Sequence, residues 1–174
     1  MAFRVDQHHP VTIPWSANGQ FYLQLGPKPY TITRMIFRVN LTVSTGATPG
    51  TLSDPWDRVL SVLQVASAGY TYLDVRDSRL LRHAQRFLGV QPRTPGGLAA
   101  SQSNVNVQFA YVVHFGVNSS ALDFRDRVEK DNPWDLSAGI PARDQTLIVT
   151  GQWGSANAPG SGYTINSGSM DIYL

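Results

Sequence analysis

The stretch Val105-Asn106-Val107-Gln108-Phe109-Ala110-Tyr111-Val112-Val113-His114-Phe115-Gly116-Val117 alternates between two kinds of residue along its whole length. Its odd positions are all apolar, whereas its even positions include asparagine, glutamine, histidine and glycine. Successive side chains of a strand point to opposite faces of a sheet. The pattern therefore predicts a long strand with one buried face and one largely solvated face.

A second stretch, Tyr30 to Ser44, shows the same alternation. One of its faces carries the apolar residues Met35, Phe37, Val39, Leu41 and Val43. At about 3.3 Å per residue such a strand would span roughly 45 Å, whereas ordinary strands span about 17–20 Å. We therefore expect this strand either to bend between two sheets or to project beyond the core.

Shorter strands are expected between turn segments rich in glycine, proline, serine and asparagine. They are Val11–Trp15, Gln20–Leu25, Tyr70–Val75, Thr146–Trp153 and Tyr163–Leu174. Lysine and glutamate, which favour helices, are represented only by Lys28, Lys130 and Glu129. Many short strands with such connections predict an all-β sandwich or barrel.

Two short helices are expected as insertions between strands, at about residues 54–66 and 78–88. In the first, Asp54 is a suitable N-cap and Pro55 suits the first helical position. Apolar residues then follow at helical spacing, namely Trp56, Val59, Leu60 and Leu63. The second helix is expected to begin near Asp77 or Ser78 and to end at Gly89.

No constellation of residues indicates catalysis, metal binding or cofactor binding. The chain has no cysteine, which excludes disulfides and thiolate metal sites. It also lacks the Gly-x-Ser-x-Gly pentapeptide of serine hydrolases. The histidines have no partners at ligand spacing, and the carboxylates of residues 123–135 alternate with basic residues as in a solvated loop. The sequence therefore predicts a protein that is not an enzyme and holds no cofactor.

The charge is nearly balanced, with 14 Lys+Arg against 12 Asp+Glu and a formal net charge of +2. Such a small excess does not by itself imply a polyanionic partner. The basic residues do concentrate in one place, at Arg76, Arg79, Arg82, His83 and Arg86. The last four have helical spacing on one face. They fit a solvated helix face, a phosphate-binding stripe or an ion-pairing strip for a neighbouring subunit.

Two stretches carry a resemblance to a known family: Tyr30-Thr31-Ile32-Thr33-Arg34-Met35-Ile36-Phe37-Arg38-Val39 and Asn104-Val105-Asn106-Val107-Gln108-Phe109. With its length, balanced charge and absent cysteine, the whole chain resembles the small major capsid proteins of tailless, icosahedral, internal-membrane phages of Thermus (the sphaerolipovirus type). The resemblance implies one jelly-roll β-barrel domain, residues 1–174. It implies a structural building block of the virion shell, assembled in the host cytoplasm, and brings no catalytic residue with it.

The resemblance also implies the partners. The barrel would pack beside copies of itself, as a homodimer or higher oligomer, and beside a larger major capsid protein. It would touch an internal lipid vesicle only peripherally, since no apolar run approaches the roughly 18 residues that span a bilayer. No specific nucleic acid is expected.

The expected subunit interface combines the basic cluster with the apolar residues at the C-terminal end of the sequence. The terminal segments Phe3–Val5 and Met170–Leu174 have strand character, and such segments can add to a neighbour's sheet edge. The interface residues expected from the sequence are Arg76, Arg79, Arg82, Arg86, Ile172, Tyr173 and Leu174.

Two other functions remain open. The first is a carbohydrate-binding or receptor-recognition module, in which Trp134 or Trp153 would contact the sugar. The second is a nucleic-acid-binding barrel, in which Arg79 and Arg82 would contact phosphates.

Overall fold

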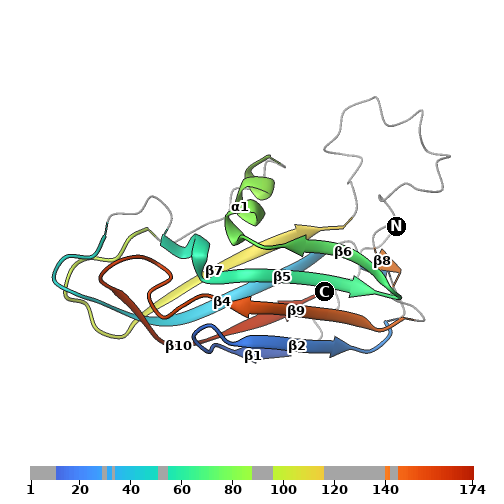
Figure 1. The fold of residues 1–174 in the computed structure, drawn as a ribbon, viewed down its shortest axis with the longest axis horizontal. Coiled ribbons are helices and arrows are strands. Elements are labelled where there is room, and N and C mark those ends of the chain that lie inside the picture. The colour runs from blue at the N-terminus through green and yellow to red at the C-terminus, as the bar shows by residue number, and fades with distance from the viewer. Residues whose placement is uncertain are drawn as a thin grey trace, which may run out of the picture.

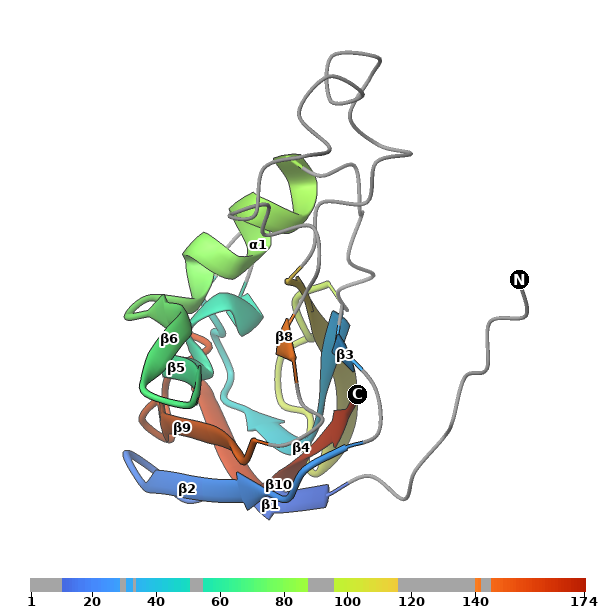
Figure 2. The same cartoon turned by 90° about the vertical axis from the view of Figure 1, so that its right-hand side faces the viewer.

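The computed structural model describes residues 11–28, 31–32, 34–50, 55–87, 96–115, 140–141 and 145–174. Within them, two four-stranded antiparallel sheets lie face to face and enclose the core (Figures 1 and 2). This confirms the all-β sandwich expected from the alternating stretches.

The first sheet has the strand order β1 (Val11–Pro14), β10 (Tyr163–Tyr173), β4 (Arg34–Thr45) and β7 (Val105–His114). The second sheet has the order β2 (Gln20–Leu25), β9 (Leu147–Trp153), β5 (Leu60–Ser67) and β6 (Tyr70–Val75). A separate two-stranded sheet pairs β3 (Thr31–Ile32) with β8 (Ile140–Pro141). The described helices are the 3-10 turn η1 (Pro55–Arg58) and the helix α1 (Ser78–Phe87).

The pairing of the eight longer strands is nested. The first strand pairs with the last, β1 with β10, and the second with the last but one, β2 with β9. Inside these pairs lie β4 with β7 and β5 with β6. Two further pairings, β10 with β4 and β9 with β5, join these pairs into the two four-stranded sheets. Eight antiparallel strands folded in this way form a jelly roll.

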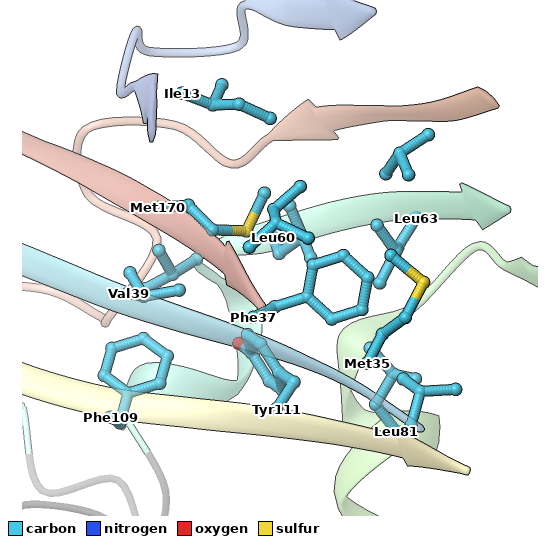
Figure 3. Packing of buried hydrophobic residues seen from close by; sticks show 14 of the residues in the cluster. Ile13, Met35, Phe37, Val39, Leu60, Leu63, Leu81, Phe109, Tyr111 and Met170 are labelled. Carbon is cyan, nitrogen blue, oxygen red and sulfur yellow. The ribbon is translucent and has the colours of Figure 1, made fainter. Parts of the chain in front are cut away.

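The core is filled by the inward faces of both sheets. In β4 every second residue is buried, and Met35, Phe37 and Val39 are each 0% exposed. In the close view, Phe37 and Met35 of the first sheet meet Leu63 of the second between the sheets (Figure 3). Apolar area removed from water contributes about 25 cal/mol per Å², so this alternation is what holds the two sheets together.

The prediction of a helix over residues 54–66 is wrong. Of residues 55–66, which the structure describes, only the single turn η1 is helical, and the chain then continues as β5, a central strand of the second sheet. The pairing of β5 with β9 has a register shift between Leu60 and Val62. The burial pattern of β5 accordingly places Leu60 and Leu63 inside, three residues apart. A bulge inserts one extra residue into a strand, so here it imitates helical spacing.

The long strand expected from Tyr30 to Ser44 is divided between two sheets. Residues 31–32 pair with residues 140–141, whereas Arg34–Thr45 form β4 between β10 and β7. The first of the two expectations, a bend between sheets, is therefore the one confirmed.

The second expected helix is confirmed as α1, over Ser78–Phe87. Both views place α1 at the side of the sandwich where β6 and β7 lie, and place β1 and β2 at the opposite side (Figures 1 and 2). Leu81 points into the core and is 5% exposed, whereas Leu80 is 59% exposed. The helix is thus an insertion between β6 and β7 that covers one side of the sandwich.

Candidate interaction surfaces

The arginine stripe expected on α1 does not lie on one exposed face. Arg82 is 1% exposed, and its guanidinium forms an ion pair with the carboxylate of Asp57 in η1. The same guanidinium lies 5.5 Å from the ring centroid of Phe109 and 5.7 Å from that of Tyr111. Arg82 therefore joins α1 to η1 and β7 inside the domain and, unlike the interface residue expected from the sequence, has almost no surface left for a subunit contact.

Tyr111 completes this buried cluster from β7. It is 0% exposed, and its hydroxyl donates a hydrogen bond of 3.1 Å to the carbonyl oxygen of Trp56. Burial raises the pKa of Tyr111 far above its usual value, which outweighs the opposing effect of the nearby Arg82 charge. The phenol is therefore a fixed neutral donor and not an acid–base group.

The other basic side chains near α1 are exposed and partly neutralised. Arg79, 51% exposed at its side chain, donates from Nε to both oxygens of Asp77 at 2.9 and 2.8 Å. Hydrogen bonding to Arg79 lowers the pKa of Asp77, although partial burial opposes it. Arg76 is 81% exposed and lies 3.5 Å from Asp74. The side chain of Arg86 lies outside the described residues.

These positions weaken both alternatives to a shell protein. Trp153, expected to contact a sugar, is 1% exposed. Its ring packs at a tilt against that of Phe21, with centroids 5.7 Å apart, and its Nε1 donates to the carbonyl oxygen of Pro14 at 3.1 Å. Trp134 lies outside the described residues. Of the two arginines expected to contact phosphates, Arg82 is buried and Arg79 is already bound to Asp77.

The apolar C-terminal residues Ile172, Tyr173 and Leu174 were expected to be available for pairing with a neighbouring subunit, but the strand that contains Ile172 and Tyr173 is already paired within its own chain. Ile172 is 3% exposed and pairs with Val11 on one side and Phe37 on the other, all within the same chain. Tyr173 and Leu174 are half-buried, and the Tyr173 ring lies 5.1 Å from the Arg38 guanidinium. Ile172 therefore belongs to the core, and Tyr173 and Leu174 are the members of this trio with surface left for a contact.

The outer face of the first sheet carries three groups of hydrogen-bonded polar side chains, which together we call the polar face. Its members alternate with the buried residues of their strands and come mostly from β4, β7 and β10. They are Thr12, Arg38, Asn40, Thr42, Ser44, Asn104, Asn106, Gln108, Asn166 and Asp171. Gln108 donates to Asn40 at 2.7 Å, and Asn166 donates to Ser44 at 2.7 Å. Apart from one Arg–Asp pair, this face is built from amides and hydroxyls.

Asp171 is the centre of the polar face. Its carboxylate accepts hydrogen bonds from Thr12 at 2.8 Å, from Arg38 at 2.8 and 3.2 Å, and from Asn40 at 3.1 Å. Burial acts to raise the pKa of Asp171, but the hydrogen bonds from Arg38 and Thr12 outweigh it, so the pKa lies below its usual range. The carboxylate thereby joins β1, β10 and β4 across the sheet.

An open groove of about 560 Å³ runs over the middle of the polar face. It is lined by residues of three adjacent strands: Asn40, Leu41, Thr42, Asn106, Val107, Gln108, Gly168 and Ser169. It contains no titratable side chain. In the part of the chain that the structure describes, no three His, Asp or Glu side chains gather as metal ligands. None of the helices among the described residues is long and apolar enough to cross a membrane.

Comparison with solved structures finds viral coat proteins of similar fold. The crystal structure of the major capsid protein of STIV matches with a TM-score of 0.61 and 16% identity, over 95% of this chain and 46% of that chain. The atomic structure of Sulfolobus turreted icosahedral virus matches with a TM-score of 0.61 and 14% identity, over 95% and 43%. The chain thus spans less than half the length of the chains it matches. No protein-family model and no curated protein matches it.

The nested pairing of the eight longer strands and this similarity lead to the same result. At such low identity the similarity shows the fold. The chain therefore has the jelly-roll fold of viral capsid proteins.

Proposed function

We propose that this chain is a structural subunit of an icosahedral viral shell. The observation that carries the proposal is the jelly roll itself, which covers 95% of the chain when aligned with a viral major capsid protein. Jelly rolls also occur in lectins and cupins, so the fold alone admits other roles. The buried state of Trp153 and the lack of a metal-ligand cluster in the described residues favour the shell over those two.

The surface chemistry suits crowding among identical neighbours. Large net charge causes subunits to repel one another, whereas this chain has a formal net charge of +2. The charged side chains on the polar face, Arg38 and Asp171, neutralise each other. The remaining amides and hydroxyls of that face offer hydrogen bonds without a strong field, so another subunit can approach it.

The proposal extends to the organisation of the shell. The whole chain, residues 1–174, is one jelly-roll domain that packs beside its own copies and beside a larger major capsid protein. Like the Thermus phage proteins that it resembles, it would assemble in the host cytoplasm, contact an internal lipid vesicle peripherally and bind no specific nucleic acid.

The exposed members of the expected interface keep their role in this proposal. Arg76, which precedes α1, and Arg79 in its first turn offer basic surface to an acidic neighbour. Arg86, whose side chain lies outside the described residues, stays a predicted member of this basic strip, and Tyr173 and Leu174 add apolar surface. Arginine is enriched at subunit interfaces because its planar guanidinium binds carboxylates with two parallel hydrogen bonds.

Sedimentation of the purified chain tests the proposal, first alone and then mixed with a larger major capsid protein from the same virus. We expect a β-rich species that self-associates and forms a stoichiometric complex with that protein, visible as regular capsomers by electron microscopy. A heat-unfolded sample is the control for non-specific adhesion. A chain that stays monomeric at high concentration and binds no coat protein would contradict the shell role.

A further inference from the structure

The four edge strands of the sandwich differ in how they are protected against pairing with another chain. Strand β1 carries Pro14, which cannot donate a backbone hydrogen bond, and α1 packs against β7. Strand β6 contains Asp74 and is followed by Arg76. Charges, proline and covering helices are the usual means by which proteins prevent edge-to-edge association.

Strand β2 has none of these protections among the residues that the structure describes. Its sequence is Gln20-Phe21-Tyr22-Leu23-Gln24-Leu25, without a charged residue, proline or glycine. It pairs with β9 over all six residues in continuous register, and β9 is its single partner strand among the described residues. Its outward residues are exposed, and the side chain of Tyr22 is 64% exposed. Such a strand presents a straight, uncharged row of backbone groups, which is a template for another strand.

The sequence of β2 is complementary to itself when the strand is reversed. With Tyr22 at the centre, an antiparallel copy places Gln20 opposite Gln24 and Phe21 opposite Leu23. Amide–amide and aromatic–aliphatic pairs directly across two strands are favourable, and no like charges meet. The exposed aromatic ring of Tyr22 would lie against the same ring of the second copy.

We infer that β2 pairs with β2 of a second copy of this chain, antiparallel, about a two-fold axis at Tyr22. The second sheets of the two barrels then join into one continuous sheet, in which the same surface is used on both subunits. This inference rests on the proposed shell role and adds to it one specific contact between two copies of the chain. The geometry of that contact is derived from β2 alone. Because the added pairing is only one short strand, we expect an association that depends on protein concentration.

Disulfide trapping tests this geometry directly, because the chain contains no cysteine. Opposite Cα atoms of an antiparallel pair lie about 4.5 or 5.5 Å apart, within the ~4.4–6.8 Å that a disulfide spans. Tyr22→Cys should therefore form a covalent dimer under mild oxidation. The matched control is Tyr70→Cys, which replaces a tyrosine 72% exposed at the opposite edge of the same sheet. Equal rates of cross-linking for the two variants would overturn the inference.

A second set of variants tests the register. Gln20→Cys alone should cross-link slowly, because its opposite position is Gln24 and not Gln20 of the second copy. Combining Gln20→Cys with Gln24→Cys should cross-link as fast as Tyr22→Cys. If Gln20→Cys alone cross-linked as fast as Tyr22→Cys, the proposed axis would be wrong.

Charge at the axis tests the contact without oxidation. Tyr22→Lys places two like charges directly opposite each other, so the dissociation constant of the dimer should rise at least about tenfold in sedimentation equilibrium. Tyr70→Lys should leave it unchanged, and circular dichroism checks that both variants fold. If the chain self-associates but Tyr22→Lys has no effect, this inference fails while the shell role stands. If the wild-type chain is a strict monomer, this inference also fails, and binding to the larger coat protein then decides the shell role separately.

Discussion

Two arginine–aspartate pairs in this molecule have similarly buried carboxylates but arginines in different surroundings. Arg82 and Asp57 meet beneath α1, where their side chains are 1% and 12% exposed. Arg38 and Asp171 meet on the polar face, where the arginine side chain is 43% exposed. The first guanidinium is enclosed by the rings of Phe109 and Tyr111, whereas the second lies over Tyr173 and remains open to solvent.

The difference shows how the same chemistry serves two purposes. A buried ion pair contributes little net stability over an apolar pair, but removing one partner leaves an uncompensated charge in the interior. Substituting either Arg82 or Asp57 should therefore weaken the packing of α1 against the sandwich. An ion pair whose arginine is open to solvent is worth less, so the Arg38–Asp171 pair mainly orders the polar face, where the hydrogen bond from Thr12 to Asp171 joins β1 to β10.

The largest expected effect comes from breaking the buried pair. Arg82→Ala should lower the free energy of unfolding by about 3–5 kcal/mol, because Asp57 loses its counter-charge in a desolvated site. Chemical denaturation measures it. The double variant Arg82→Met with Asp57→Leu should recover most of the loss, since both charges are then gone. A loss for Arg82→Ala no larger than that for Arg38→Ala would contradict the contrast between the two pairs.

The next effect concerns the centre of the polar face. Asp171→Asn removes a charged acceptor that receives hydrogen bonds from Thr12, Arg38 and Asn40, and should lower stability by about 1–3 kcal/mol. Amide hydrogen exchange should rise most in β1, because Thr12 lies in that edge strand. Asp74→Asn, at a 39% exposed carboxylate 3.5 Å from Arg76, is the matched control and should leave exchange in β1 unchanged.

The same carboxylate gives the protein a pH dependence on the acid side. The pKa of Asp171 is lower in the folded chain than in the unfolded chain, where it is about 3.9. Its stabilising contribution is therefore complete above the unfolded value and is lost as pH falls through the folded value. Tm measured from pH 7 to pH 2 should fall less steeply for Asp171→Asn than for the wild-type chain. Parallel curves would show that Asp171 does not carry the acid sensitivity.

The smallest expected effect on stability is at the exposed pair beside α1. Arg79→Ala should leave Tm within about 1 °C of wild type, because exposed ion pairs contribute little. It should nevertheless weaken binding to the larger coat protein if the basic strip contacts that partner. Leu80→Ala, the adjacent 59% exposed position, is the control for loss of side-chain surface on the same helix. Unchanged binding by Arg79→Ala would remove this arginine from the proposed interface.

The strands with undisturbed alternation were predictable from local pattern. In β4 and β7 the residues at every second position are buried, as the alternation of Met35, Phe37 and Val39 and of Val107, Phe109 and Tyr111 indicates. The sequence pattern failed at β5, where the bulge between Leu60 and Val62 shifts the alternation. A bulge depends on the partner strand, here β9, and that partner lies far away in the sequence.

The candidate surfaces were predictable only in part. Helical spacing grouped Arg79, Arg82 and Arg86 on one face, but it could not show that Arg82 meets an acidic partner from η1. A buried guanidinium is acceptable only where a counter-charge compensates for its lost water, and that counter-charge, Asp57, belongs to another element. Likewise, the strand character of Ile172 was evident, whereas its place between β1 and β4 of its own chain was not.

By itself, the sequence determined the all-β class, most of the strands and the helix α1, because these follow from the alternation of neighbouring side chains and from local capping. The tertiary structure alone decided the nested strand order, the conversion of the expected first helix into β5, and which charged residues are buried. These features depend on residues distant in sequence, and their free energy arises only when both sheets and α1 are assembled.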